Sequence, residues 1–117
     1  MYKMHLPALL LAALAAGCAT RPATPVTVMP VADFASCAKP MYPRESLRHE
    51  HTGTVTLSFL VGQQGAVEAS NIKTSSGHVL LDEAARAAIA QCRFKPGTID
   101  GQPATLWMNM QYVWTLR

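Results

Sequence analysis

The chain has 117 residues, of which ten are Lys or Arg and seven are Asp or Glu, giving a net charge of +3 at neutral pH. A charge this small and this scattered excludes the basic surface of a nucleic-acid-binding protein. The length excludes more than one domain of ordinary size. Hydrophobic residues make up 50% of the chain, but an apolar run near the N-terminus supplies much of that figure, so it is not a property of the fold.

The N-terminus has the organisation of an export signal. Lys3 precedes an apolar run from Leu6 to Ala16, which is shorter than the roughly 20 residues of a membrane-spanning helix. The small residues before Cys18 match the cleavage pattern of bacterial lipoproteins, in which the Cys thiol receives a lipid. We therefore expect residues 1–17 to be a lipoprotein signal peptide and Cys18 to be the lipid attachment site. An ordinary secretory signal with an unmodified Cys18 is the alternative.

Residues 18–36 are expected to be the lipidated Cys and a tether. Three prolines and many small residues occur there without helical periodicity, a composition typical of a linker. The residue after Cys18 is Ala19 rather than the Asp that retains many lipoproteins at the inner membrane. The chain is thus expected to face the periplasm from a lipid anchor, with the outer membrane favoured over the inner.

Two cysteines remain after Cys18 is assigned to the lipid. Cys37 and Cys92 form an even pair in an oxidising compartment, which predicts a disulfide. Two buried free thiols are the alternative.

The first elements of the expected domain, residues 37–117, are a short helix and a strand. Pro43 suits the first turn of a helix, and Leu47 is expected to point inward. Residues 53–61 alternate between apolar and polar side chains, which predicts a half-buried strand. The apolar members are Val55, Leu57, Phe59 and Val61.

A hairpin and a second helix follow. Residues 62–65 contain two glycines and predict a turn, and residues 66–74 predict the returning strand. Its apolar members Val67 and Ile72 are five residues apart, so they share a face only if a β-bulge intervenes. Residues 80–91 have helical periodicity, with an inward side made of Leu81, Ala84, Ala85, Ala88, Ile89 and Cys92.

The chain closes with the clearest strand. After a turn at residues 99–103, apolar residues recur at every second position from Leu106 to Leu116, as in a strand with one buried face. The order helix, strand, strand, helix, strand predicts the α+β class. We expect a three-stranded antiparallel sheet with two helices packed on one face.

Several spaced features resemble the C-terminal domain of the TonB family of periplasmic energy transducers. The resemblance covers residues 38–117, and its ordered set of motifs is more specific than any one of them. The set comprises Tyr42-Pro43, Gly53-Thr54-Val55, Gly65 with Val67, Ser75-Ser76-Gly77, Leu81-Asp82 with Ala84 or Ala85, Arg93-Phe94-Lys95-Pro96 and the closing strand. The resemblance implies the same fold of two helices on a three-stranded sheet. It also implies binding to outer-membrane transporters, whose extended segment adds to the edge of the last strand.

Carried over to this chain, the resemblance places the binding edge at residues 105–115. Trp107, Asn109, Gln111 and Val113 would flank an incoming strand on the face away from the helices. Ordinary packing of Trp107 and Val113 on an exposed sheet face is an equal alternative. A homodimer through the last strands, or an accessory envelope lipoprotein with another protein partner, also stays open.

Two features depart from the family. Full transducers carry an N-terminal membrane helix and a long Pro-rich spacer, whereas this chain has the lipoprotein pattern and a short tether. Position 92, often aromatic in the family, is Cys. A lipid cannot couple to a proton-driven motor as a membrane helix does, so binding is expected rather than energy transduction by this chain alone.

No residue pattern indicates catalysis or a cofactor. His49 and His51 are two residues apart, do not share a helical face, and have no third metal ligand nearby in sequence. His78 is expected to be a solvated turn residue. Asp82 and Glu83 are adjacent in sequence rather than placed across a cleft. We expect no enzyme activity, no cofactor and no metal site.

Overall fold

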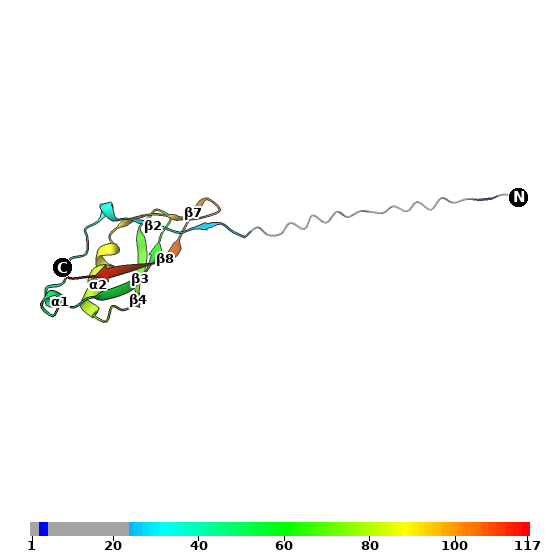
Figure 1. The fold of residues 1–117 in the computed structure, drawn as a ribbon. Helices are drawn as coiled ribbons and strands as arrows, with labels where there is room; N and C mark the ends of the chain where they lie inside the picture. Colours follow the sequence, from blue (N-terminus) through cyan, green and yellow to red (C-terminus); the bar gives the residue numbers. More distant parts are fainter. Residues whose placement is uncertain (1–2, 5–23) are drawn as a thin grey trace.

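The computed structural model describes residues 3–4 and 24–117 (Figure 1). Cys18, most of the predicted signal peptide and the first part of the predicted tether lie outside these residues. No helix in the described ranges is long and apolar enough to cross a membrane.

The described part contains two α-helices, one 3-10 helix and eight strands. Many of the strands are only two or three residues long. In chain order the elements are β1 (Thr27–Val28), β2 (Val31–Asp33), η1 (Phe34–Ser36), α1 (Arg44–Arg48), β3 (Gly53–Val61), β4 (Val67–Thr74), α2 (Val79–Ile89), β5 (Arg93–Lys95), β6 (Gly97–Ile99), β7 (Gln102–Ala104) and β8 (Leu106–Trp114).

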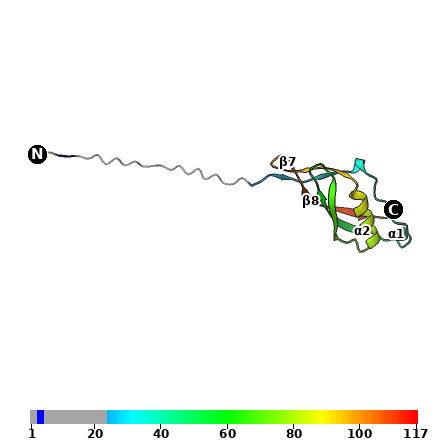
Figure 2. The same ribbon diagram turned by 180° about the vertical axis from the view of Figure 1, so that it is seen from behind.

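The main sheet has the strand order β4-β3-β8, and both pairings are antiparallel. β3 is the central strand, and its four apolar residues at alternate positions are completely buried. The helix α2 covers the face toward which they point, in front of the sheet in Figure 2. The predicted alternation of β3 and the predicted three-stranded antiparallel sheet are therefore confirmed.

The hairpin between β3 and β4 contains a bulge, the condition under which Val67 and Ile72 can share a face. Leu60 pairs with Ala69 and Val61 pairs with Val67, so Glu68 is an extra residue in β4. As a result Val67 and Ile72, five residues apart, both pack against the core. Gly65 closes the turn with φ of +87° and lies so near the Phe94 carbonyl that a Cβ would collide with it.

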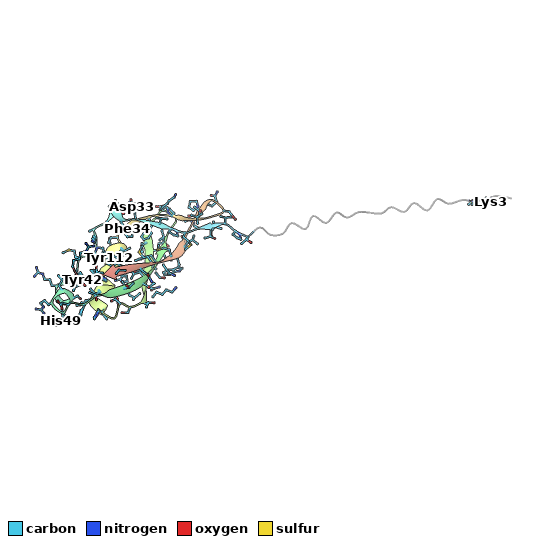
Figure 3. All side chains as sticks on the ribbon, in the orientation of Figure 1. Lys3, Asp33, Phe34, Tyr42, His49 and Tyr112 are labelled. Atoms are coloured by element: carbon cyan, nitrogen blue, oxygen red, sulfur yellow. A yellow bond between two sulfur atoms is a disulfide. The ribbon has the colours of Figure 1, made fainter. Side chains whose placement is uncertain are left out.

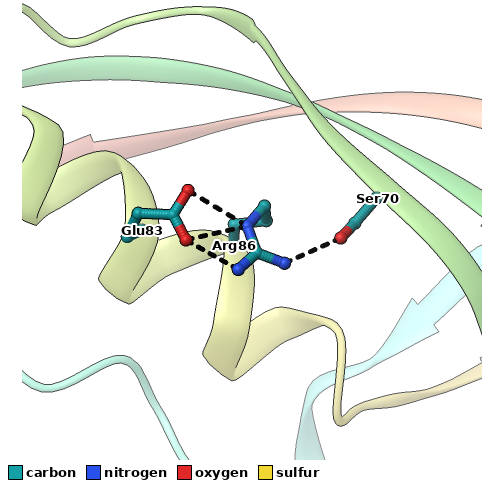
Figure 4. Close-up of polar contacts among 3 residues, drawn as sticks. All are labelled: Ser70, Glu83 and Arg86. Atoms are coloured by element: carbon teal, nitrogen blue, oxygen red, sulfur yellow. Dashed lines mark hydrogen bonds and ion pairs between the residues drawn. The ribbon is translucent and has the colours of Figure 1, made fainter.

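The helix α2 is tied to the sheet by packing and by one polar bridge. Leu81, Ala85 and Ile89 are buried in the core. The Arg86 guanidinium forms an ion pair with Glu83 at 2.6 Å and donates a hydrogen bond of 2.9 Å to the Ser70 hydroxyl on β4 (Figure 4). Arg86 therefore links the solvent side of α2 to the outer strand of the sheet.

The fold has more strands than predicted, and of the two α-helices in residues 24–117 it is α2 that packs on the main sheet. The short strands form two further sheets, β1-β6-β7 and β2-β5. The helix α1 lies near the C-terminus, beyond the end of β8 (Figure 1). The inward orientation predicted for Leu47 is wrong, because Leu47 is 44% exposed and Ser46 is completely buried. The Ser46 hydroxyl lies 3.3 Å from His51 Nδ1.

The prediction of a tether up to residue 36 is also wrong for its second half. The Asp100 N–H donates to the Val26 carbonyl at 2.8 Å, and the Val26 N–H donates to the Asp100 carboxylate at 2.9 Å. From there β1 pairs with β6 and β2 pairs with β5. Prolines are compatible with edge strands as well as linkers, so composition alone did not separate the two.

The disulfide predicted between Cys37 and Cys92 is present in the structure, where it spans 55 residues of sequence. Cys92 is buried at the end of α2, and Cys37 packs against the same core. The bond fastens the segment after η1 to the body of the domain.

Asp82 organises the turn that leads into α2. It accepts hydrogen bonds from the Ser76 N–H at 2.8 Å, the Ser76 hydroxyl at 2.7 Å and the Ser75 hydroxyl. Burial alone raises the pKa of the Asp82 carboxyl, but these bonds and the nearby His78 outweigh it and lower the pKa below 3.8. The ionised form of Asp82 is therefore stabilised in the folded state.

Replacing Asp82 with Asn should lower the free energy of unfolding by about 1–2 kcal/mol at pH 7, because hydrogen bonds to a charged group are lost. Since the folded pKa is lowered, the contribution of Asp82 is complete above the unfolded pKa and disappears as the pH falls through the folded pKa. Urea unfolding at pH 7 and pH 2 measures both effects. The control Glu83→Gln alters an exposed pair and should cost less than about 1 kcal/mol; equal losses for the two variants would contradict this role of Asp82.

Candidate functional site: the edge formed by the last strand

The strand β8 forms one edge of the main sheet. In the described part of the chain it pairs only with β3, along the whole register from Gly53 opposite Trp114 to Val61 opposite Leu106. Its outer side therefore carries a row of backbone groups without a strand partner. A sheet edge of nine residues is long enough to pair with an extended segment.

The backbone groups that face this open edge are those of the four predicted residues. The Gly62 N–H donates to Ala66 on the β4 side, and backbone direction alternates along a strand. The backbone groups of Val61 and the other buried residues of β3 therefore point toward β8. Their register partners on β8 point back toward β3. The N–H and C=O groups left for an incoming strand belong to Trp107, Asn109, Gln111 and Val113.

The same four residues have their side chains on the face away from α2. Trp107 is 45% exposed and Val113 is 58% exposed, while Asn109 accepts a hydrogen bond from the Ser58 hydroxyl of β3. The structure thus brings all four predicted residues into one row.

The opposite face of β8 ends in an aromatic cluster. The Trp114 ring makes edge-to-face contacts with Tyr42, at a centroid distance of 4.8 Å, and with Tyr112, at 4.9 Å. Tyr42 donates from its hydroxyl to the His51 carbonyl, and burial raises the pKa of the Tyr112 hydroxyl. Trp114 is buried, and its indole N–H has no hydrogen-bond acceptor among the described residues. The cluster fixes the end of β8 against the segment before α1.

Beside this cluster are two adjoining hollows that the sequence did not predict. They share Lys39, Pro40 and Tyr112. One, of about 440 Å³, is completed by Phe34, and the other, of about 330 Å³, extends along the end of β8 past Tyr42. Figure 3 shows Phe34, Tyr112 and Tyr42 following one another on this side of the molecule. No sequence signal joined Phe34 to the site, because it lies in the segment taken for a tether.

The three histidines His49, His51 and His78 lie together in the structure, although His78 is far from the other two in sequence. The His51 and His78 rings stack at a centroid distance of 3.9 Å, and His49 stacks on His51 at 5.5 Å. Stacked rings do not direct their nitrogens at a common point, and no group of three or more potential ligands in the described ranges is arranged for a metal. Contrary to the prediction of a solvated turn residue, His78 is partly buried.

His51 should titrate below the usual imidazole pKa of 6.5. Burial lowers the pKa of His51, and the charges of His78 and His49 lower it further against an opposing effect of Glu45. Because the folded pKa is lowered, protonation favours the unfolded state, and stability should fall as the pH drops below about 6.5. An NMR titration of the full chain measures the pKa, which His78→Gln should raise more than His49→Gln does. A His51 pKa of 6.5 or higher in the unaltered protein would contradict the effect of the stack.

Sequence comparison relates this chain to proteins of known family. Residues 38–116 match the family model described as the Gram-negative bacterial TonB protein C-terminal. The chain is 43% identical over 60 residues to a protein TonB of Neisseria meningitidis serogroup C, covering 51% of this chain and 22% of that protein. It is 33% identical over 79 residues to a protein TonB of Vibrio cholerae, covering 68% of this chain and 32% of that protein.

A solved structure shares the fold. The solution NMR structure of the Pseudomonas aeruginosa TonB C-terminal domain superimposes with a TM-score of 0.59 at 19% identity, covering 74% of this chain and 86% of that domain. The chain spans between about a fifth and a third of the length of the curated relatives named above. The family match across residues 38–116 shows that this chain belongs to the TonB C-terminal domain family.

Proposed function

We propose that the chain is a non-catalytic binding module of the bacterial envelope that captures an extended segment of an outer-membrane transporter. The observation that carries this proposal is the unpaired outer side of β8. The segment would add to the sheet as a fourth strand, bonded to the backbone of the four edge residues. Membership of the TonB family supports a transporter as the partner class.

Side chains on the open face of the sheet could contact an added strand, in addition to the backbone pairing at the edge. Trp107 lies across from Leu60 and Val113 lies across from Thr54, so apolar surface stands near both ends of β8. Alternate side chains of an added strand would lie beside these residues. Backbone pairing supplies affinity, and such side-chain contacts supply preference among segments.

We propose further that Cys18 is lipidated and holds the domain at the periplasmic side of a membrane, with the outer membrane favoured. Among the described residues Val26 is the first that is hydrogen-bonded to the body of the domain, so the proposed tether is residues 19–25. At about 3.1 Å per residue it reaches roughly 20 Å, which places the domain close to the surface. With a lipid in place of a membrane helix, the module would bind without transducing energy by itself.

The anchor is tested by expressing the full chain and the Cys18→Ser variant in a Gram-negative host. The unaltered chain should enter the membrane fraction, and its mature N-terminal peptide should carry the mass of a lipid. Cys18→Ser should be released as a soluble periplasmic protein. Equal membrane association of the two chains, without lipid mass, would contradict lipidation.

The binding function is tested with synthetic peptides that cover the N-terminal segments of outer-membrane transporters from the source genome. Amide NMR shifts should concentrate on residues 105–115 for at least one peptide. No shift with any of these peptides would overturn the transporter proposal. Sedimentation of the unbound chain should show a monomer, because a dimer paired through β8 would occupy the same edge.

A further inference from the structure

We propose that the disulfide-fastened segment 34–40 and Tyr112 form a specificity pocket for one large apolar side chain of the strand that adds to β8. This inference rests on the proposed strand addition and concerns which segments are accepted. Its occupant is an extended partner segment with an apolar residue opposite Tyr112.

The position of the pocket follows from strand geometry. Side chains of neighbouring strands that lie opposite one another are on the same face of a sheet. Tyr112 belongs to the buried-side row of β8, whereas Gln111 and Val113 belong to the other face. A residue placed opposite Tyr112 would therefore direct its side chain toward the hollow that Tyr112 lines with Phe34, Lys39 and Pro40.

The chemistry of the walls selects the occupant. The hollow of about 440 Å³ is formed by two aromatic side chains, a proline and the side chain of Lys39. Phe34 is 60% exposed, so an apolar side chain placed there would remove part of its ring from water, which favours binding. Lys39 offers a positive charge at the same hollow. Among the described residues the one ion pair joins Arg86 and Glu83, so Lys39 has no carboxylate partner there. A carboxylate beside the apolar residue would complement Lys39.

The disulfide helps to hold the wall of this pocket that contains Phe34 in place. Phe34 belongs to η1, which ends at Ser36, and Cys37 is bonded to Cys92 at the end of α2. The Ser36 hydroxyl also accepts a hydrogen bond of 2.8 Å from the Arg93 N–H. These two links hold Phe34 beside Lys39 and Pro40. The family match begins at residue 38, so Phe34 is a feature of this chain outside the matched domain.

The test uses the full chain and two nine-residue synthetic peptides of alternating Thr and Val. In one peptide the residue designed to lie opposite Tyr112 is Leu and the next residue on the same face is Glu. In the other both are Ser. The unaltered chain should bind the Leu peptide more tightly, and Phe34→Ser should weaken that binding about tenfold while leaving the Ser peptide unchanged. The control Val31→Ser removes an apolar side chain that is 59% exposed and outside the hollow, and it should leave both affinities unchanged.

The outcomes separate the pocket from the edge. Thermal melting should confirm that Phe34→Ser stays folded, since the side chain is exposed. If Phe34→Ser binds each peptide as tightly as the unaltered chain does, while Gln111→Pro abolishes binding, the pocket is overturned and strand addition stands. If Gln111→Pro leaves binding unaltered, the proposed function itself fails. Equal affinity of the unaltered chain for the Leu and Ser peptides also overturns the pocket.

Discussion

Replacing Gln111 with proline should weaken capture of an extended segment at least tenfold and leave the domain folded. The Gln111 N–H faces the open edge and not β3, so its loss removes a bond to the added strand without removing one from the sheet. One such hydrogen bond contributes about 0.5–1.5 kcal/mol, and the proline ring adds a clash with the incoming backbone. A tenfold change corresponds to about 1.4 kcal/mol. Isothermal titration of a binding peptide measures the loss.

The matched control is Gln111→Thr, which changes the same side chain and keeps the N–H. Thr favours strands, and the variant should bind as the unaltered chain does. Circular dichroism should show that both variants keep their secondary structure. Equal binding by the proline and threonine variants would mean that the edge backbone of β8 does not carry the interaction.

Removing the disulfide should produce the largest loss of stability. Changing both Cys37 and Cys92 to Ser should lower the free energy of unfolding by about 4 kcal/mol in the chain-entropy model, because the bond closes a loop of 55 residues. Cys92 is also buried among apolar residues, so a serine hydroxyl there adds a further cost. Urea unfolding of the oxidised chain and of the double variant gives the difference.

Cys18→Ser is the control for this experiment. It removes a cysteine without touching the disulfide and should leave the unfolding midpoint unchanged. Reduction of the unaltered chain by dithiothreitol should reproduce most of the loss seen in the double variant. A double variant as stable as the oxidised chain would show that the Cys37–Cys92 disulfide is unimportant for stability.

The central hairpin was predictable because its signals are local. In β3 every second residue is buried, and period-two alternation is the direct sequence signature of that environment. The spacing of Val67 and Ile72 allowed a shared face only with a bulge, and the structure contains one. The edge residues on β8 were predictable for the same reason, once the resemblance had indicated which strand lies at the edge.

The short strands were missed because they have no periodicity and depend on distant partners. Thr27 pairs with Ile99, more than 70 residues later, and β5 has only three residues. Hydrophobicity favours an inward Leu47, whereas α1 buries Ser46 instead, and the Ser46 hydroxyl contacts His51. The hollow beside Tyr112 was not predictable, because it forms only when η1 and the disulfide bring Phe34, Lys39 and Pro40 next to Tyr112.

Hydrogen exchange at single amides of β8 is the most direct test of strand addition. The amides of Met108, Met110 and Tyr112 bond to β3 and should exchange slowly in the free chain. The amides of Trp107, Asn109, Gln111 and Val113 should exchange rapidly until a binding peptide is added, and then become protected together. Protection confined to β4, the other edge of the sheet, or unchanged exchange of these four amides in the bound state, would contradict the account.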